Sequence, residues 1–439
     1  MLYDVKVSNL ASEDWAPPVR VFFDNLEDNP PLRLALSVTA TVCYSALSPR
    51  LRVKYPYDTD LSMLLVNLLI IGFSGAGKGT VRKVVFIIMK MLIEREMEER
   101  RIYREALEAN KRRNANKDKD KEPLVAIRFL QSFTLPVVVK YCDHMHRRYG
   151  DWLSFFLFGN ELGSFIENKR NKADFQAVSR CAYNLGELYS RDTLYEAGYN
   201  GLVDICWNSV ICGQEQSLHE YIDKKGVVVG DAGRQIVIKL RDSLGEKPPV
   251  FHPLTDEQQK IVDTTVKKLM EETFTDDDKL QPIHVVDMSW LDENVKDWCS
   301  WQRFDVIKTG SRAQNSFYVR ASVSAFRLCT MLYHLWGETE ESKEHVRRCY
   351  YAFANYILDK LVQEFGQIYE SAMPKEKECT AKIYLYDQMP RKFTRKQLSE
   401  KIAELELGTA ARQFLYKWKK ANLIWKVEEE EDTYEKIYE

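Results

Sequence analysis

The chain has 439 residues, of which 45% are hydrophobic and 29% charged, and its 63 Lys and Arg nearly balance 65 Asp and Glu. This composition excludes a disordered chain, and the balanced charge excludes binding to nucleic acid through a global positive field. The length predicts two or three domains. Any contact with nucleic acid therefore has to come from a local basic patch.

The cysteines and the amino-terminal segment indicate the compartment. Nine cysteines are scattered without a CxxC pair or a spacing that suits zinc, which is typical of reduced, buried thiols. Acidic residues interrupt the first 18 residues, so no signal peptide is predicted. The longest apolar run, at 61–73, is shorter than the roughly 20 residues that span a bilayer. We expect a cytoplasmic protein with no membrane association.

Residues 1–60 predict a helical lead-in. Pro30 and Pro31 stand where a helix begins, and the segment LRLALSVTATVCYSAL that follows has apolar positions spaced for one buried face. We expect this helix to pack beside the domain that follows it.

Residues 61–250 alternate strand-like and helix-like patterns and predict a nucleotide-binding α/β domain. A long helix begins near Lys78 and becomes polar from Glu94, so residues 94–121 form a helical arm that is either solvated or binds a partner. The strand-like runs are LLVNLLII at 64–71, VAIRFL at 125–130, LSFFLF at 153–158, VDICWNSVICG at 203–213 and VVVGDAGRQIVIKL at 227–240. Strands that alternate with helices predict a parallel sheet covered on both faces.

Residues 251–374 have helical patterns and predict a helical domain. Residues 375–439 predict a winged-helix module, because two helices flank a glycine turn at Gly408 and a charged hairpin follows them. The apolar positions Phe414, Leu415, Trp418 and Leu423 should face the core of this module. The outward residues of the second helix, which we interpret as facing phosphates or a groove of DNA, are Arg412, Gln413, Lys417, Lys419 and Lys420.

Two interpretations of the carboxy-terminal module stay open. The acidic run EEEED at 428–432 would repel DNA if it lay against the phosphate backbone. Winged helices also serve as protein-docking modules. The sequence therefore predicts contact with either DNA or a protein partner.

The segment GFSGAGKGT at 72–80 is the most specific motif, because it follows an apolar run and precedes a helix. A loop of this kind directs backbone N–H groups and a lysine at phosphates, which predicts ATP as cofactor. The residues that we assign to nucleotide binding are Gly72, Ser74, Gly75, Ala76, Gly77, Lys78, Gly79 and Thr80. Gly79 stands where a hydroxyl side chain usually binds Mg²⁺, so Thr80 becomes the candidate metal ligand. The alternative is a glycine turn with a solvated lysine.

Hydrolysis also needs a carboxylate near the attacking water. The apolar run 153–158 leads to Asn160 and Glu161, and it predicts a Walker B strand adjacent to the strand before the loop. Glu161 would polarise the water, and Asn160 would take the place of the aspartate associated with Mg²⁺. The alternative is that Asn160 caps a helix.

Further polar residues are candidates for sensing or completing the site. Gln214 ends the run 203–213 and could orient the water, with Asn208 as the substitute and a capping role as the alternative. Arg234 follows a glycine turn and could reach the nucleotide of a neighbouring subunit as an arginine finger, or form a surface ion pair. Arg327, in the helical region, is a weaker candidate for a sensor, and a partly buried arginine in an ion pair is the favoured alternative.

With these residues in place, the chain resembles P-loop proteins of the primase-helicase type from Bacteroides-like bacteria, their mobile elements and phages. The corresponding segments are GFSGAGKGT, FTLP at 133–136, Asn160 with Glu161, GDAGR at 230–234 and the module from Phe393 onward. The resemblance implies a ring-forming ATPase akin to superfamily-three helicases, without the primase half that accompanies some such proteins.

The leading hypothesis is therefore an ATP-hydrolysing, helicase-like motor that acts on DNA in the replication or mobilisation of a mobile element or phage. Its expected partners are DNA, further copies of the chain in a ring, and a primase or another replication protein. One alternative is a nucleotide-gated scaffold that hydrolyses slowly and docks partners. Another is an adenylate-kinase-like nucleotide kinase, suggested by the GKGT spelling but lacking an arginine-rich lid.

Overall fold

The computed structural model describes residues 5–112, 122–132, 134–167, 169–191, 201–242, 244, 245, 247–372, 385, 386, 388–405, 410–420, 423–427 and 432–437. Four predicted features lie wholly or partly outside these residues. They are the end of the polar arm at 113–121, Phe133 of FTLP, the turn at Gly408 and most of the acidic run at 428–432.

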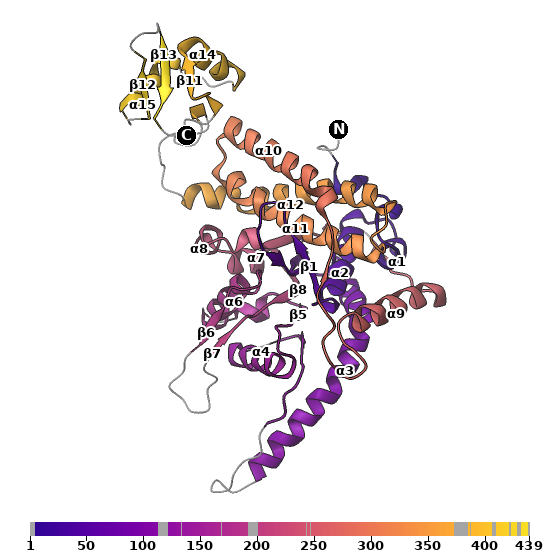
Figure 1. Ribbon diagram of the computed structural model, residues 1–439. Coiled ribbons are helices and arrows are strands. Elements are labelled where there is room, and N and C mark those ends of the chain that lie inside the picture. The colour runs from indigo at the N-terminus through magenta and orange to yellow at the C-terminus, as the bar shows by residue number, and fades with distance from the viewer. Residues whose placement is uncertain are drawn as a thin grey trace.

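A five-stranded parallel sheet organises the fold (Figure 1). Its spatial order is β4-β5-β8-β3-β9. The strands are β3 (Asn67–Ile71), β4 (Phe129–Leu130), β5 (Phe155–Gly159), β8 (Trp207–Gly213) and β9 (Gln235–Lys239). Every residue of β3, β5 and β8 is buried, as the apolar runs predict for a parallel sheet covered on both faces. The predicted α/β class is confirmed.

The sheet corrects three details of the sequence prediction. Only Phe129–Leu130 of the run 125–130 forms a strand. Within 227–240 the strand is limited to Gln235–Lys239, because the start of that run belongs to the short helix α8 (Lys224–Val228). The prediction that β5 lies beside β3 is wrong, because β8 pairs with both of them.

Helices surround the sheet and continue into the region after β9 (Figure 1). Up to β9 they are α1 (Pro17–Asp24), α2 (Pro30–Leu47), α3 (Lys78–Arg112), α4 (Leu135–Tyr149), α5 (Gly163–Ile166), α6 (Lys169–Cys181), α7 (Glu215–Tyr221) and α8. Four long helices follow: α9 (Asp256–Glu271), α10 (Asp292–Thr309), α11 (Arg312–Leu335) and α12 (Ser342–Ala372). The predicted helix starts at Pro30 and Lys78 are confirmed, as is the unit β4-α4-β5 with its parallel strands.

The lead-in helix α2 is buried on all sides and not on one face as predicted. Fifteen of its 18 residues are buried, because α2 packs against α1, α3, α9, α11 and the sheet. Two of its buried hydroxyl groups donate to carbonyls one turn earlier in the helix, whereas the hydroxyls of Ser37 and Thr39 have no partner among the described residues. Thr41 Oγ1 donates to the carbonyl of Ser37 at 2.9 Å, and Ser45 Oγ donates to that of Thr41 at 3.0 Å.

The polar half of α3 begins as a support for the sheet. Glu96 is 2% exposed, and its carboxylate accepts the backbone N–H groups of Arg128 (2.8 Å) and Phe129 (3.0 Å) at the edge strand β4. Arg148 of α4 pairs with Glu99 at 2.8 Å. The described turns just after Glu94 are therefore neither fully solvated nor free for a partner.

Short strands join distant parts of the chain. β1 (Leu51–Lys54) pairs in parallel with β10 (His284–Val285) and antiparallel with β2 (Leu61–Ser62). β6 (Tyr189–Arg191) and β7 (Gly201–Val203) form a separate antiparallel ribbon. The expectation of purely helical structure after β9 is wrong at β10. Short 3₁₀ turns occur at Val7–Asn9, Ser12–Asp14, Ala232–Arg234 and Ser289–Leu291.

The carboxy-terminal unit is a three-stranded antiparallel sheet with two helices. Its sheet order is β11-β13-β12, formed by β11 (Lys392–Thr394), β12 (Ile424–Lys426) and β13 (Thr433–Lys436). The helices are α14 (Arg395–Glu404) and α15 (Ala411–Lys420). Thr394 caps α14 by accepting the N–H of Gln397 at 3.2 Å. Phe414, Leu415 and Trp418 are buried as predicted, whereas Leu423 is only partly buried.

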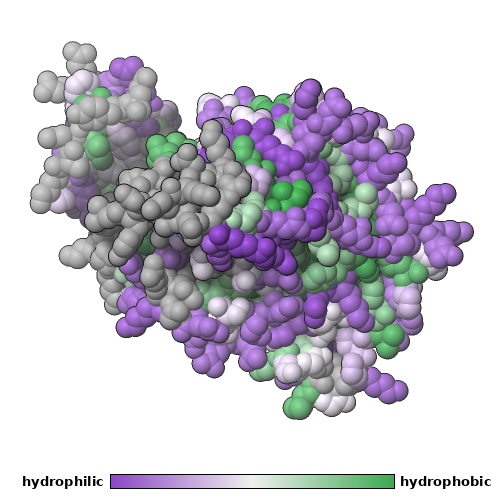
Figure 2. All heavy atoms as spheres, turned by 90° about the horizontal axis from the view of Figure 1, so that it is seen from below, coloured by the Kyte–Doolittle hydropathy of each residue, from purple (hydrophilic) through white to green (hydrophobic). Residues whose placement is uncertain are grey.

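The buried apolar residues form two major cores that do not follow all the predicted boundaries. One core runs from Leu10 to Phe365 and takes in the lead-in, the sheet and α9 to α12. A second core runs from Leu385 to Tyr434. On the face seen in Figure 2, hydrophilic residues cover most of the surface and hydrophobic residues lie in small groups between them. Among the described helices, none is long and apolar enough to span a bilayer.

Candidate functional site

The loop between β3 and α3 is shaped by glycines. Gly75 and Gly77 have φ values of 88° and 93°, in the left-handed region that only glycine adopts freely. A Cβ on Gly77 would lie 2.6 Å from Leu32 Cδ2, so α2 packs where a side chain would have to be. The chain can therefore fold tightly from the end of β3 into the first turn of α3.

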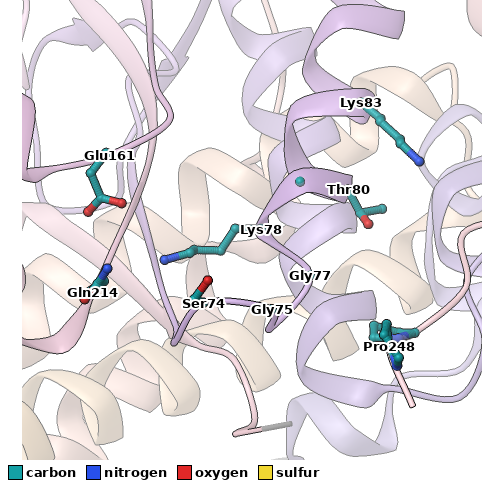
Figure 3. A pocket seen from close by; sticks show the side chains of 11 residues that line it. Ser74, Gly75, Gly77, Lys78, Thr80, Lys83, Glu161, Gln214 and Pro248 are labelled. Atoms are coloured by element: carbon teal, nitrogen blue, oxygen red, sulfur yellow. The ribbon is translucent and has the colours of Figure 1, made fainter. Parts of the chain in front are cut away.

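Lys78 begins α3 and turns its side chain back over this loop. Its Nζ donates to the carbonyl of Gly72 at 2.8 Å and to that of Gly213 at 3.2 Å. In Figure 3 the lysine side chain points towards Glu161 and Gln214. The positive charge is thus held between the ends of β3 and β8.

A cavity of about 520 Å³ opens over this loop. Its lining comes from the loop, the start of α3, the segments after β5 and β8, and the segment after β9 (Figure 3). The lining residues are Ser74, Gly75, Gly77, Lys78, Gly79, Thr80, Lys83, Glu161, Gln214, Pro248 and Pro249. This volume lies in the range of small-molecule and cofactor sites. Of the predicted loop residues, Gly72 and the buried Ala76 support the loop without lining the cavity.

Glu161 reaches the cavity from the second strand away from β3. Because β8 lies between β3 and β5, the two strands are about 9–10 Å apart. Two contacts fold the chain over the strand ends here. Leu162 N donates to Cys212 O at 2.7 Å, and a Cβ on Gly213 would lie 2.9 Å from Leu162 Cβ. Glu161 is partly exposed, and Lys78 and Glu161 therefore line one cavity with room between them.

Asn160 and Gln214 are placed differently, although each follows the end of a strand. Gln214 lines the cavity and precedes α7 without capping it through its side chain. Asn160 is exposed and is not among the lining residues. The geometry therefore brings Gln214, and not Asn160, together with Lys78 and Thr80.

Arg234 lies at the amino ends of the strands, whereas the cavity lies at their carboxyl ends. It directly precedes β9, which runs parallel to β3, whereas the glycine-rich loop follows the carboxyl end of β3. Its Nη1 donates to the carbonyl of Gly230 at 2.9 Å. Burial, followed by the nearby charge of Arg320, lowers its pKa from the ordinary value. Arg234 therefore cannot act on the cavity of its own chain.

Two other polar residues have structural roles. Asn208 is buried in β8, where its Oδ1 accepts the N–H of Val66 at 2.9 Å. Arg327 is buried in α11 and donates to the carbonyls of Leu65 at 3.0 Å and Tyr183 at 2.9 Å. Arg327 thus ties α11 to the segment before β3, through carbonyl groups and not through an ion pair as expected.

Sequence reasoning missed three cavity residues and one neighbouring cluster. Lys83, Pro248 and Pro249 carry no motif, and their place depends on how α3 and the segment after β9 pack. Lys239 Nζ lies 2.7 Å from Glu215 Oε1 and 2.7 Å from Glu364 Oε2. Since Glu215 directly follows Gln214, these ion pairs connect the cavity rim to α12.

The predicted outward face of α15 is exposed where its side chains are described. Arg412, Gln413, Lys417 and Lys419 are exposed, and the Lys419 ammonium lies 5.0 Å from the ring centroid of Tyr434. The side chain of Lys420 lies outside the described residues.

Comparison with known proteins adds no relative to this picture. No protein-family model matches the chain, and no similar curated protein is found. The interpretation of the site therefore depends on its geometry.

Proposed function

We propose that the chain is a P-loop ATPase that hydrolyses ATP through Glu161 and works as a helicase-like motor on DNA. One observation carries the proposal. A single cavity is lined by the glycine-rich loop, Lys78, Thr80 and Glu161. Cationic and N–H groups suit phosphates, and a carboxylate one intervening strand away suits a water that attacks the terminal phosphate.

Each lining residue has a distinct role in this proposal. The loop amides and Lys78 bind the β- and γ-phosphates, for which the Lys78 ammonium leaves its two carbonyl partners. Lys83, at the cavity rim, adds a second positive charge. Thr80 offers the hydroxyl ligand for Mg²⁺, which would neutralise phosphate charge when bound. Glu161 accepts a proton from the attacking water, and Gln214 orients that water.

The DNA and ring parts of the proposal depend on two other regions. The carboxy-terminal unit has the strand and helix order of a winged helix, and α15 presents an exposed basic face for phosphates. Arg234 lies far from the cavity of its own chain, so as an arginine finger it would have to act on a neighbouring copy. That role would require Arg234 to leave the carbonyl of Gly230.

Three substitutions test the ATPase. Lys78→Ala should abolish ATP binding. Glu161→Gln should retain ATP binding and lower kcat by about 10²–10⁴-fold, the usual contribution of a general base. Asn160→Ala is the matched control, since Asn160 follows the same strand outside the cavity, and it should change kcat little. Unchanged ATPase activity in Glu161→Gln would refute the assignment, and a large loss in Asn160→Ala would restore its predicted role in holding Mg²⁺.

Mass measurement and DNA stimulation separate the motor from the alternatives. A motor should form a larger assembly with ATP and DNA, and DNA should raise its turnover. Exchanging Arg412 and Lys417 for Ala together should reduce that stimulation without changing basal turnover. Tight ATP binding with negligible turnover and no response to DNA would instead favour a nucleotide-gated scaffold, and phosphate transfer to a nucleoside monophosphate would favour a kinase.

A further inference from the structure

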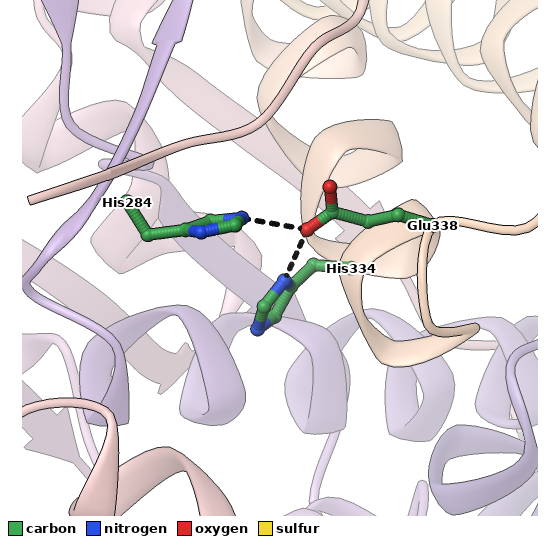
Figure 4. A group of neighbouring side chains, drawn as sticks. All are labelled: His284, His334 and Glu338. Atoms are coloured by element: carbon green, nitrogen blue, oxygen red, sulfur yellow. Dashed lines mark hydrogen bonds and ion pairs between the residues drawn. The ribbon is translucent and has the colours of Figure 1, made fainter.

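A second group of side chains with metal-ligand chemistry lies on other elements than the nucleotide cavity. His284 Nε2 and His334 Nδ1 each lie 2.8 Å from the same oxygen, Glu338 Oε1 (Figure 4). All three ligand atoms lie within 4.8 Å of one another. Two imidazoles and one carboxylate are a donor set that zinc and its neighbours prefer.

The fold brings these three residues together from two segments, and a neighbouring carboxylate, Glu272, comes from a third. His284 lies in β10, which is fixed by pairing with β1, and its N–H donates to the carbonyl of Arg50 at 3.1 Å. His334 lies in the last turn of α11. Glu338 follows that helix, and Glu272 stands directly after α9.

The turn after α11 is shaped to direct Glu338 back onto His334. Gly337 N–H donates to the carbonyl of His334 at 2.9 Å, and Glu338 N–H donates to that of Tyr333 at 3.0 Å, which is the Schellman pattern. Glu338 itself has a φ of 58°, a conformation that is unfavourable for a residue with a Cβ. Gly337 with a φ of 80° fills the position where such a helix end normally has glycine, and the following turn at Glu338 aims its carboxylate at the last turn of α11.

Glu272 makes a contact of the kind that positions metal-binding histidines. Its Oε2 lies 2.9 Å from His334 Nε2, the ring nitrogen that does not face Glu338. Histidine ligands of metal ions regularly donate the other ring N–H to a carboxylate, which fixes the tautomer and the ring orientation. His334 is 6% exposed, whereas His284 is 51% exposed, so a cation and a water ligand can enter from the His284 side.

We propose that His284 Nε2, His334 Nδ1 and Glu338 Oε1 bind one divalent transition-metal ion of the zinc class, with Glu272 as the positioning residue and water as the fourth ligand. In a tetrahedral zinc site with bonds of about 2.0–2.1 Å, ligand atoms stand about 3.3 Å apart. The two 2.8 Å contacts would therefore need to lengthen by roughly 0.5 Å, which side-chain rotation can supply. The bound ion would clamp β10 to the end of α11, and α9 is joined to this site through the contact of Glu272 with His334.

In the absence of a metal ion, hydrogen bonds between the two histidine rings and the carboxylates of Glu272 and Glu338 hold the cluster together. Both ring nitrogens of His334 lie within hydrogen-bond distance of a carboxylate oxygen. Burial lowers the pKa of His334, but the hydrogen bonds and charges of Glu272 and Glu338 outweigh burial and raise the pKa above the ordinary value. When an ion binds, the proton on His334 Nδ1 leaves to solvent, and the proton by which His284 Nε2 donates to Glu338 moves through solvent to Nδ1 of the same ring. The two freed lone pairs form the metal bonds, while His334 Nε2 keeps its proton and donates it to Glu272.

The test uses the full chain after treatment with a chelator, without nucleotide, and titrates it with Zn²⁺ and separately with Co²⁺. We expect one bound ion per chain by calorimetry, a higher Tm with Zn²⁺, and the visible absorption of four-coordinate Co²⁺. His284→Ala and Glu338→Gln should each weaken binding by at least 100-fold. Glu272→Gln should keep one ion per chain and weaken binding by about 10–100-fold.

His252→Ala is the matched control, because His252 is an exposed histidine outside the cluster, and it should bind as the wild type does. Circular dichroism verifies that every variant is folded, and His284→Ala is the least disruptive because its ring is half exposed. Absence of a stoichiometric ion in the wild type, or unchanged binding in both His284→Ala and Glu338→Gln, would overturn the proposal. Neither outcome bears on the ATPase, since no nucleotide is present.

Discussion

Gly77 and Gly79, at the start of α3, differ sharply in the space that each leaves for a methyl group. A Cβ on Gly77 would meet Leu32 Cδ2 at 2.6 Å and would require a φ near 93°, whereas a Cβ on Gly79 has nothing within 4 Å. Gly79 lies within the helix, where alanine is favoured over glycine by roughly 1 kcal/mol. The loop sequence is therefore constrained by packing against α2 at one glycine and not at the other.

This contrast gives the first prediction. Gly77→Ala should lower the free energy of unfolding by about 1–3 kcal/mol and weaken ATP binding, because the loop must move away from α2. Gly79→Ala should leave the free energy of unfolding unchanged or slightly raised. Urea denaturation and nucleotide titration of the two variants measure the difference, and equal behaviour of the pair would contradict the argument.

Glu96 supports a prediction about pH. Burial raises its pKa to about 7 from the ordinary 4.5, although the amides of Phe129 and Arg128 and the charge of Arg128 act in the opposite direction. A raised pKa means that the folded state binds the proton more tightly. The stability that this contributes is complete below about pH 4.5 and is lost as the pH rises through about 7.

Glu96→Gln should remove that dependence, because the amide does not titrate. Between pH 5 and pH 8 the wild type should lose up to about 3 kcal/mol more unfolding free energy than the variant does. Urea denaturation at the two pH values measures this. Parallel stability curves for the two proteins would show that the amide hydrogen bonds hold Glu96 ionised throughout.

Among the elements, α11 depends on Arg327 for its attachment to the sheet region. The buried guanidinium donates to the carbonyls of Leu65 and Tyr183 and to Asn184 Oδ1, and its Cζ lies 4.5 Å from the ring centroid of Tyr183. Removing the guanidinium would leave two buried carbonyls without these donors. Such unsatisfied groups cost about 1–3 kcal/mol each.

Arg327→Leu should therefore lower the unfolding free energy by about 2–4 kcal/mol. Arg101→Leu is the matched control, because Arg101 is 56% exposed and, within the described part of the chain, its ion pairs are with Glu98 and Glu105 on its own helix. That change should cost less than about 1 kcal/mol. Chemical denaturation measures the unfolding free energy of both variants. Comparable losses would mean that the buried arginine contributes no more stability than a surface arginine does.

The elements also indicate how far the sequence could predict this molecule. The strand before the glycine-rich loop, the long helix from Lys78 and the residues Glu161 and Gln214 carry local signals, namely apolar runs that end in polar or glycine residues. The strand order carries no such signal, because β5 and β8 are both short apolar runs and either could lie beside β3. The pairing of β1 with β10 joins residues more than 200 positions apart, so His284 could not be connected with His334 and Glu338 from the sequence.

On the scale of the whole molecule, the two hydrophobic cores should behave as two cooperative units. The larger core unites the lead-in, the sheet and the long helices, and the smaller one lies within the carboxy-terminal unit. A cooperative unit corresponds to a contiguous packed core, so one domain can unfold while the other remains folded. Calorimetry of the full chain should therefore resolve two transitions, with the smaller enthalpy belonging to the carboxy-terminal unit because enthalpy scales with the number of residues.

A matched pair of substitutions assigns these transitions. Leu398 and Leu361 are both fully buried, the first in the smaller core and the second in the larger. Leu→Ala changes at such positions cost about 2–5 kcal/mol. Leu398→Ala should lower the Tm of the smaller transition alone, and Leu361→Ala that of the larger alone. A single transition that both variants shift equally would mean that the two cores unfold together. The carboxy-terminal unit would then have to pack against the larger core, which contains the nucleotide cavity.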